Sequence, residues 1–119
     1  MEYIDLKTAL ALSSAGKRFI AQMTLYNSGN LDRLATFIAE SYTPEQLAEQ
    51  PAADRLAAMQ QAQNEAGRLR IFHHISVDDY RVVLLLQNQG GDLFYNRLKV
   101  SEDYPHLITQ YIHRPHGAG

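Results

Sequence analysis

The pattern of apolar residues changes once along this chain, at about residue 66. Before that point apolar residues recur every three or four positions, as on one face of a helix, and after it they alternate as in strands. Consecutive strands with no helices between them form an antiparallel sheet, and the preceding helices pack on one of its faces. We therefore predict an α+β fold, with N-terminal helices packed on one curved antiparallel sheet.

The helical part divides into three main segments. We expect the first from Asp5 to about Asn27, although residues 13–16 (Ser-Ser-Ala-Gly) leave open whether it is one helix or two. The second spans residues 31–41 and ends before Pro44, which starts a short turn of helix at residues 44–49. The third spans residues 52–66, and Gly67 is a natural stop.

Four strand-type segments follow, separated by turn residues. We expect strands at residues 69–77, 80–87, 93–101 and 107 to about 113, and an irregular tail at residues 116–119. The loop at residues 88–92 (Asn-Gln-Gly-Gly-Asp) is typical of a hairpin. Because hairpins join neighbouring strands, the four strands should pair in sequence order.

Alternation within the strands predicts which residues face the helices. In the third strand Arg97 and Lys99 mark the outer face, so the inner face should hold Phe94, Leu98 and Val100. The same rule predicts which residues of the other two strands face the helices. In the second strand they are Val82, Leu84 and Leu86, and in the first strand they are Leu69, Ile71, His73 and Ile75. The fourth strand is ambiguous, and a slip of one residue would exchange the two faces of any strand.

An apolar set remains on the predicted outer face. Its members are Phe72, Val83, Leu85, Tyr95 and Tyr111. Contiguous apolar patches on a protein surface tend to be interfaces, so we expect a homodimer through this open face of the sheet. The alternative is that the sheet curls over and buries part of the set.

Composition excludes several classes of function. The chain has 119 residues, enough for the single domain 1–119 that we predict, and a net charge of −2. Its 11 lysines and arginines are scattered, so we expect no nucleic-acid partner.

No apolar run is long enough to span a membrane, and residues 1–5 do not resemble a signal peptide. We therefore expect a cytoplasmic protein without a membrane partner.

Two neighbouring segments resemble a known superfamily. Residues 25–34 (LYNSGNLDRL) and 37–45 (FIAESYTPE) are similar to a helix junction in the nuclear transport factor 2-like superfamily, which includes the SnoaL-like proteins. The resemblance implies a cystatin-like cone, in which the sheet curves around a pocket. Some members are enzymes with Asp, His and Tyr inside the cone, whereas many others bind ligands, dimerise or assist a neighbouring domain.

The candidate pocket residues are Tyr26, Tyr42, His73 and Asn96. On the predicted inner face, His73 could titrate near neutral pH and act as a general base, with Tyr42 and Asn96 polarising a carbonyl. The alternative is a partly buried histidine bonded to a backbone carbonyl or to water. No metal-binding motif and no cofactor motif accompanies these residues, so we expect neither a metal nor a cofactor.

These observations favour a non-enzymatic module that binds a small apolar or carboxylated ligand or a protein partner. The alternative is a small cone-fold enzyme of the isomerase, dehydratase or hydrolase type, with His73 as the catalytic candidate. A third reading is an accessory domain whose cone is filled by its own side chains.

Overall fold

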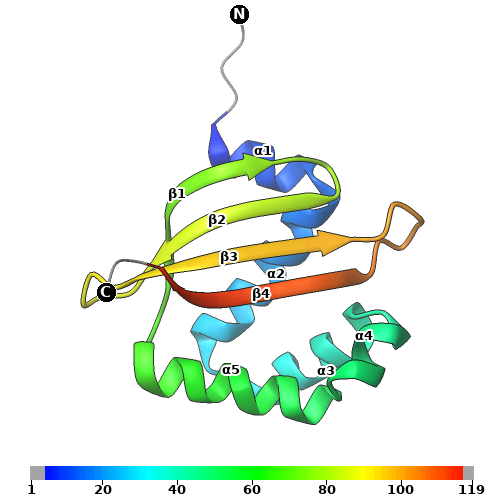
Figure 1. Ribbon diagram of the computed structural model, residues 1–119, viewed down its shortest axis with the longest axis horizontal. Coiled ribbons are helices and arrows are strands. Elements are labelled where there is room, and N and C mark those ends of the chain that lie inside the picture. Colours follow the sequence, from blue (N-terminus) through cyan, green and yellow to red (C-terminus); the bar gives the residue numbers. More distant parts are fainter. Residues whose placement is uncertain (1–4, 117–119) are drawn as a thin grey trace, which may run out of the picture.

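A computed structural model describes residues 5–116 and confirms the α+β fold (Figure 1). Five N-terminal helices pack on an open four-stranded antiparallel sheet, with the strands in the order β1-β2-β3-β4. The elements are α1 (Leu6–Leu12), α2 (Ser14–Ser28), α3 (Leu31–Ser41), α4 (Pro44–Glu49), α5 (Ala52–Ala66), β1 (Arg70–Val77), β2 (Arg81–Gln87), β3 (Leu93–Val100) and β4 (Ile108–His116). The predicted tail is wrong at His116, which ends β4, and residues 117–119 lie outside the described part.

The first predicted helix is two helices separated by Ser13. The Ser13 hydroxyl accepts a hydrogen bond from the Gly16 N–H at 3.0 Å and caps α2. The same hydroxyl donates to the backbone carbonyl of Asp78 at 2.6 Å, which ties this junction to the β1–β2 turn. The Leu10 backbone packs so closely on Gly16 that a Cβ at this position would collide with it. Ser13 and Gly16 therefore let the chain bend sharply and keep α1 against α2.

The remaining helix ends follow the predicted signals. Gly29 ends α2 in the left-handed conformation, with φ of 72°, and the Asn30 side chain caps α3 by accepting from the Arg33 N–H. The Thr43 hydroxyl caps α4, and Gly67 ends α5 with φ of 77°. Local sequence thus determines where each helix begins and ends.

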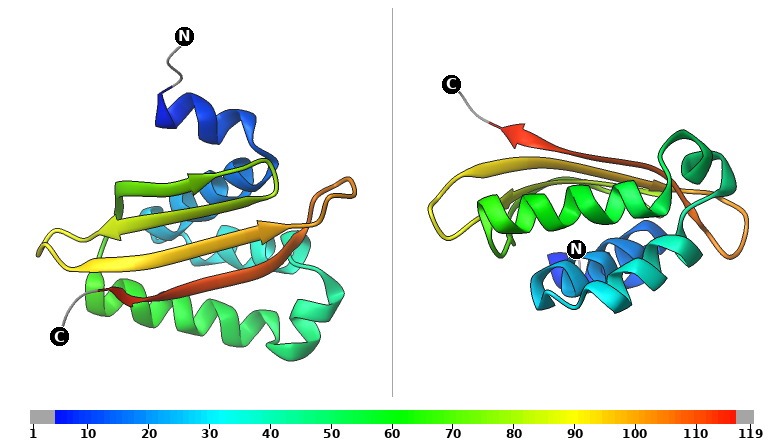
Figure 2. Two further views of the ribbon diagram at one scale, coloured as in Figure 1. Left: turned by 45° about the horizontal axis from the view of Figure 1, so that its top comes forward. Right: turned by 90° about the horizontal axis from the view of Figure 1, so that it is seen from below.

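The core lies between the sheet and the layer formed by α2 and α3. Figure 2 shows α1, α2 and α3 on one side of the sheet, with α5 running alongside β4 and α4 beside the end of the sheet. The most completely buried side chains come from both layers and from the chain segment after α3. They are Leu10, Ile38, Tyr42, Val82, Leu84, Leu86, Asn96, Leu98 and Ile108. The opposite face of the sheet carries no helix among the described residues.

The two central strands have the predicted orientation. β2 and β3 pair without interruption, with Val82 opposite Leu98 and Leu84 opposite Asn96. All four side chains are buried beneath the helices. The alternation of apolar and charged residues in these strands was therefore sufficient to assign their faces.

β1 departs from the predicted alternation because it contains two register shifts. The shifts fall between Ile71 and His73 and between His74 and Ser76, and each adds a residue to β1 that has no partner on β2. After the first shift His73 pairs with Leu85, which belongs to the open face. The predicted inward orientation of His73 and Ile75 is therefore wrong, and Ile75 is 55% exposed.

β4 contains a similar shift next to Ile108. Val100 pairs with Ile108 but Lys99 pairs with Gln110, so Thr109 is the extra residue. As a result Ile108 is buried, while Tyr111 and His113 lie opposite Leu98 and Asn96 on the inner face. The predicted outward orientation of Tyr111 is therefore wrong.

None of the helices in residues 5–116 has the length and apolar composition needed to cross a membrane.

Replacement of Gly16 by alanine tests the contact between α1 and α2. Helix propensity alone predicts that Gly16→Ala stabilises α2 by about 1 kcal/mol. The collision with the Leu10 backbone predicts instead a destabilisation of about 1–3 kcal/mol. Urea unfolding followed by circular dichroism measures the difference. The control is Thr24→Ala, at an exposed position of the same helix, which should leave stability within about 0.5 kcal/mol.

Candidate functional site

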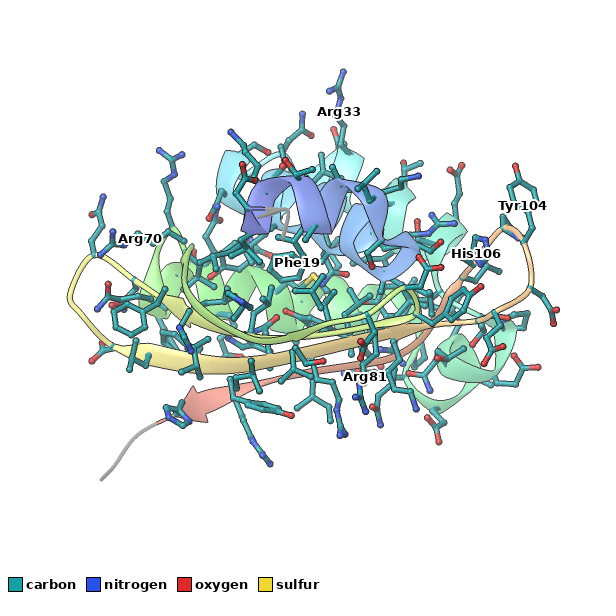
Figure 3. All side chains as sticks on the ribbon, turned by 90° about the horizontal axis from the view of Figure 1, so that it is seen from above. Phe19, Arg33, Arg70, Arg81, Tyr104 and His106 are labelled. Carbon is teal, nitrogen blue, oxygen red and sulfur yellow. The ribbon has the colours of Figure 1, made fainter. Side chains whose placement is uncertain are left out.

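A cavity of about 290 Å³ lies between α2, α5 and the inner side of β4. Its wall combines apolar side chains with polar groups from three separate parts of the chain. The lining residues are Phe19, Gln22, Met23, Tyr26, Gln50, Arg55, Ala58, Met59, Ala62, Leu69, Tyr111 and His113. Figure 3 shows Phe19, one of the lining residues, between the helices and the sheet. Side chains therefore do not completely fill the space between the helices and the sheet.

Arg55 is the charged residue of the cavity wall, and it is only 7% exposed. Its Nε donates to the backbone carbonyl of Gln50 at 2.8 Å, and its Nη2 donates to that of Gln46 at 2.6 Å. Its guanidinium carbon also lies 4.8 Å from the centre of the Tyr42 ring. Within residues 5–116 no carboxylate forms an ion pair with Arg55. The wall thus holds a buried positive charge whose partners are neutral.

A buried hydrogen bond sets the orientation of Gln22. The Tyr42 hydroxyl donates to Gln22 Oε1 at 2.6 Å, so the carbonyl end of the Gln22 amide is occupied. Burial raises the pKa of Tyr42, which keeps this hydroxyl protonated and able to donate. The amide nitrogen of Gln22, which can only donate, is the end left to interact with other groups at the cavity.

Two further tyrosines of the cavity wall also keep their protons. Burial raises the pKa of Tyr26 to about 12, and its hydroxyl donates to the Gly67 carbonyl at 3.0 Å. Burial also raises the pKa of Tyr111, and interactions with Gln22 and Asn96 lower it only in part. Both side chains are neutral at physiological pH, and the Tyr111 hydroxyl retains a proton that it can donate to a ligand.

His113 is a neutral residue held by Asn96. Burial lowers the pKa of His113 from 6.5, and its ring stacks on Phe94 with 5.2 Å between the ring centres. Asn96 Nδ2 lies 2.6 Å from His113 Nδ1 and 3.3 Å from the Tyr95 carbonyl, an orientation that makes the amide nitrogen the donor to both. His113 Nδ1 is then the acceptor, and the proton of the neutral ring sits on Nε2. The ring can therefore donate a further hydrogen bond from Nε2.

Three polar side chains of the wall share one chemical property. Gln22, Tyr111 and His113 each offer a proton donor, and Arg55 adds a positive charge. The acceptor atoms of Gln22 and His113 are already occupied by Tyr42 and Asn96. A site that offers donors and a cation beside an apolar wall matches a ligand with an apolar body and an acceptor group, such as a carboxylate.

The structure brings together part of the predicted pocket. Tyr26 lines the cavity, while Tyr42 and Asn96 lie behind the wall and orient Gln22 and His113. His73 is exposed and lies outside the lining residues, because the first register shift of β1 turns it to the open face. The predicted place of His73 on the pocket wall is wrong, and the histidine of the cavity is His113.

Sequence reasoning missed Arg55, Gln22 and His113 as wall residues. The alternation of Tyr111 and His113 in the fourth strand was a usable signal, since it groups two polar aromatic side chains on one face. Nothing local distinguishes Arg55 from the exposed charges of α5. Its burial depends on α4, whose carbonyls it binds and which lies nearby only in the folded chain.

The residues of the predicted dimer interface divide between two regions. Val83, Leu85 and Tyr95 lie on the open face of the sheet, and Phe72 is 53% exposed on the edge strand β1. Tyr111 instead lines the cavity. The predicted homodimer interface therefore loses Tyr111, while Val83, Leu85 and Tyr95 remain together on the open face.

The neutral state of His113 predicts a specific dependence of stability on pH. Because the folded protein lowers the pKa of His113 below 6.5, the unfolded chain binds a proton more readily. Stability should therefore fall as the pH falls below about 6.5, and part of this loss should disappear in His113→Gln. The urea midpoint measured between pH 7.5 and pH 5.5 checks this. His74→Gln, at an exposed position, should keep the wild-type pH dependence.

No protein-family model, curated protein sequence or solved structure matches this chain. The geometry of the cavity is therefore the basis of the functional proposal.

Proposed function

We propose that this protein binds a small, mainly apolar molecule through a carboxylate group, in a cone of the nuclear transport factor 2-like type. The element order, with helices first and one antiparallel sheet after them, is compatible with that cone. The isolated parallel β-bridge between Tyr42, after α3, and Ile108, at the start of β4, is also compatible with that cone. The proposed activity is binding, without a chemical step.

The observation that carries the proposal is the set of donors around Arg55, which is buried and has no counter-ion among residues 5–116. Removing a charge from water costs several kcal/mol unless a partner compensates it. The carbonyls of Gln46 and Gln50 compensate Arg55 only in part, because they are dipoles and carry no net charge. A carboxylate in the cavity would neutralise the guanidinium and accept from Tyr111, His113 and Gln22.

The apolar part of the wall indicates the rest of the ligand. Phe19, Met23, Met59 and Leu69 contribute large apolar surfaces, and Ala58 and Ala62 leave room between α5 and the sheet. A volume of about 290 Å³ lies at the lower end of the range for small-molecule sites. The ligand should therefore be compact, such as a branched or cyclic carboxylic acid. Methionine side chains can adjust to its shape.

The enzyme alternative loses its predicted base, because His73 lies outside the cavity. His113 could take that place only after the contact with Asn96 is rearranged, since its Nδ1 accepts from Asn96 and its Nε2 carries the proton. Among residues 5–116 the wall contains no carboxylate and no free imidazole nitrogen that could act as a general base. Binding without turnover is accordingly the function that this arrangement supports better.

Cyclohexanecarboxylate is a suitable probe of the proposed site. With cyclohexylmethanol as the neutral analogue and cyclohexylmethylamine as the cation, it separates the effect of charge from that of shape. Titration calorimetry at pH 7.5 should show the carboxylate binding at least tenfold more tightly than either analogue. Equal binding of the alcohol and the carboxylate would refute the role of Arg55.

Filling the cavity provides the matched test of where the probe binds. Ala62→Phe places a ring inside the cavity and should abolish binding, whereas Ala57→Phe changes an exposed position of the same helix and should have no effect. Thermal unfolding of both variants checks that the fold is retained. Binding that survives Ala62→Phe would place the probe elsewhere and contradict the proposal.

Substitution of Arg55 tests the charge itself. Arg55→Lys keeps the positive charge and should weaken carboxylate binding by less than tenfold. Arg55→Met keeps much of the apolar stem and should weaken it by tenfold or more. Arg55→Met also leaves the Gln46 and Gln50 carbonyls without their donor, so its unfolding midpoint must be measured alongside. If both folded variants bind the carboxylate as the wild type does, Arg55 takes no part in binding.

A further inference from the structure

The open face of the sheet is positively charged, although the whole chain has a net charge of −2. The four strands contain no aspartate and no glutamate. The face that carries no helix presents Arg81 from β2, Arg97 and Lys99 from β3, and Arg114 from β4. Figure 3 shows Arg81 on this side of the sheet and Arg33, from α3, on the opposite side.

The strand register brings these cations close together. Arg81 is directly opposite Lys99, and Arg114 is directly opposite Tyr95. Because alternate residues of a strand are about 6.6 Å apart, Lys99, Arg97 and the Arg114–Tyr95 pair form a row along β3. Like charges directly opposite each other destabilise a sheet. The ion pair of Arg81 with Asp78, at 3.4 Å, is exposed and relieves this repulsion only slightly.

Two polar atoms of the same face are shielded from water and have no hydrogen-bond partner in the described part of the chain. They are Arg97 Nε, a donor, and Gln110 Oε1, an acceptor. Gln110 pairs with Lys99 and Arg97 pairs with Ile112, so both side chains belong to adjacent strands of the open face. Shielded polar atoms normally find a hydrogen-bond partner. A bound polypeptide offers both kinds of group, since each residue carries one donor and one acceptor.

The centre of the face is apolar. Val83 is 8% exposed although no helix covers it, and Leu85 and Ile112 are half-buried beside it. The long side chains of the neighbouring cations account for this coverage, because their apolar stems can lie over the sheet while their charged ends remain in water. The face thus alternates between apolar side chains and positive charges.

We propose that this open face, which we call the basic face (Arg81, Arg97, Lys99 and Arg114), binds an acidic polypeptide segment of a partner protein. An extended segment with acidic residues at alternate positions would match the two-residue spacing of the cations. The acidic side chains would then all point to the sheet, with their methylene groups over Val83, Leu85 and Ile112 and their carboxylates at the cations. This proposal is independent of the ligand in the cavity.

Charge disfavours the two other occupants. A symmetric dimer would place the basic face of one copy against that of another, and like charges across an interface cost several kcal/mol. A single-stranded nucleic acid needs exposed aromatic rings for its bases. On this face the Tyr95 ring is covered by Arg114, whose guanidinium carbon lies 4.7 Å from the ring centre.

The test compares an acidic peptide with a nucleic acid of similar charge. A fluorescent nine-residue peptide of alternating Glu and Val should bind the full chain, and the same peptide with Gln in place of Glu should not. Fluorescence anisotropy should show binding that weakens as the salt concentration rises. Lys99→Glu and Arg114→Glu, both at exposed positions, should each weaken binding at least tenfold. Arg33→Glu changes the charge equally on the opposite side and should have little effect.

Each alternative has a distinct outcome. If a twelve-nucleotide oligouridylate binds in place of the peptide and is lost in Lys99→Glu, the partner is a nucleic acid and the proposal is wrong. If the wild type sediments as a dimer and Lys99→Glu sediments as a monomer, the face pairs with a second copy. If Arg33→Glu weakens peptide binding as much as Lys99→Glu does, the effect comes from net charge and the basic face is not a site.

Discussion

One extra residue in β4 determines what both faces of the sheet can do. Thr109 lies between Ile108, which pairs with Val100, and Gln110, which pairs with Lys99. Thr109 itself has no partner on β3, so every later residue of β4 changes face. Tyr111 and His113 consequently point to the cavity, while Ile112 and Arg114 join the open face. Without this shift the cavity would lose two of its donors and the basic face would lose the cation that covers Tyr95.

Residues behind the cavity wall determine which hydrogen-bonding atoms the wall can offer to a ligand. Tyr42 occupies the acceptor of Gln22, and Asn96 occupies the acceptor of His113. Both are completely buried, and they come from the end of α3 and the centre of β3. A small change in either one would alter which atoms the wall offers to a ligand. Tyr42 and Asn96 are therefore positioning residues for the proposed site, because each orients a donor of its wall.

The sequence was most informative where structure follows from local rules. The start at Asp5, the break before Pro44 and the stop at Gly67 correctly placed several helix boundaries. Alternation assigned β2 and β3 because these strands pair without interruption. The same reasoning failed in β1 and β4, since an unpaired residue changes the face of every residue after it and has no reliable signature in a single sequence.

The candidate site was only partly predictable for a related reason. Tyr26, Tyr42 and Asn96 were identified because apolar neighbours marked them as inward-facing. Arg55 was missed because its burial results from tertiary contacts with α4, and His73 was favoured because its strand was assumed to be regular. The sequence placed Arg97 and Lys99 on the outer face, but it did not indicate that Arg114 of β4 joins them there. That grouping depends on strand register, which links residues far apart in the sequence.

The register shifts have another consequence, which concerns aggregation. An open sheet has two edge strands whose free backbone groups can recruit further strands, and bulges, charges and prolines at an edge prevent this. β1 combines two shifts with Arg70, His73 and His74, and β4 contains Pro115, which lacks a backbone N–H, and is bridged at its start by Tyr42. Growth of the sheet is thus discouraged at both edges, and the protein can keep its broad face open without forming fibrils.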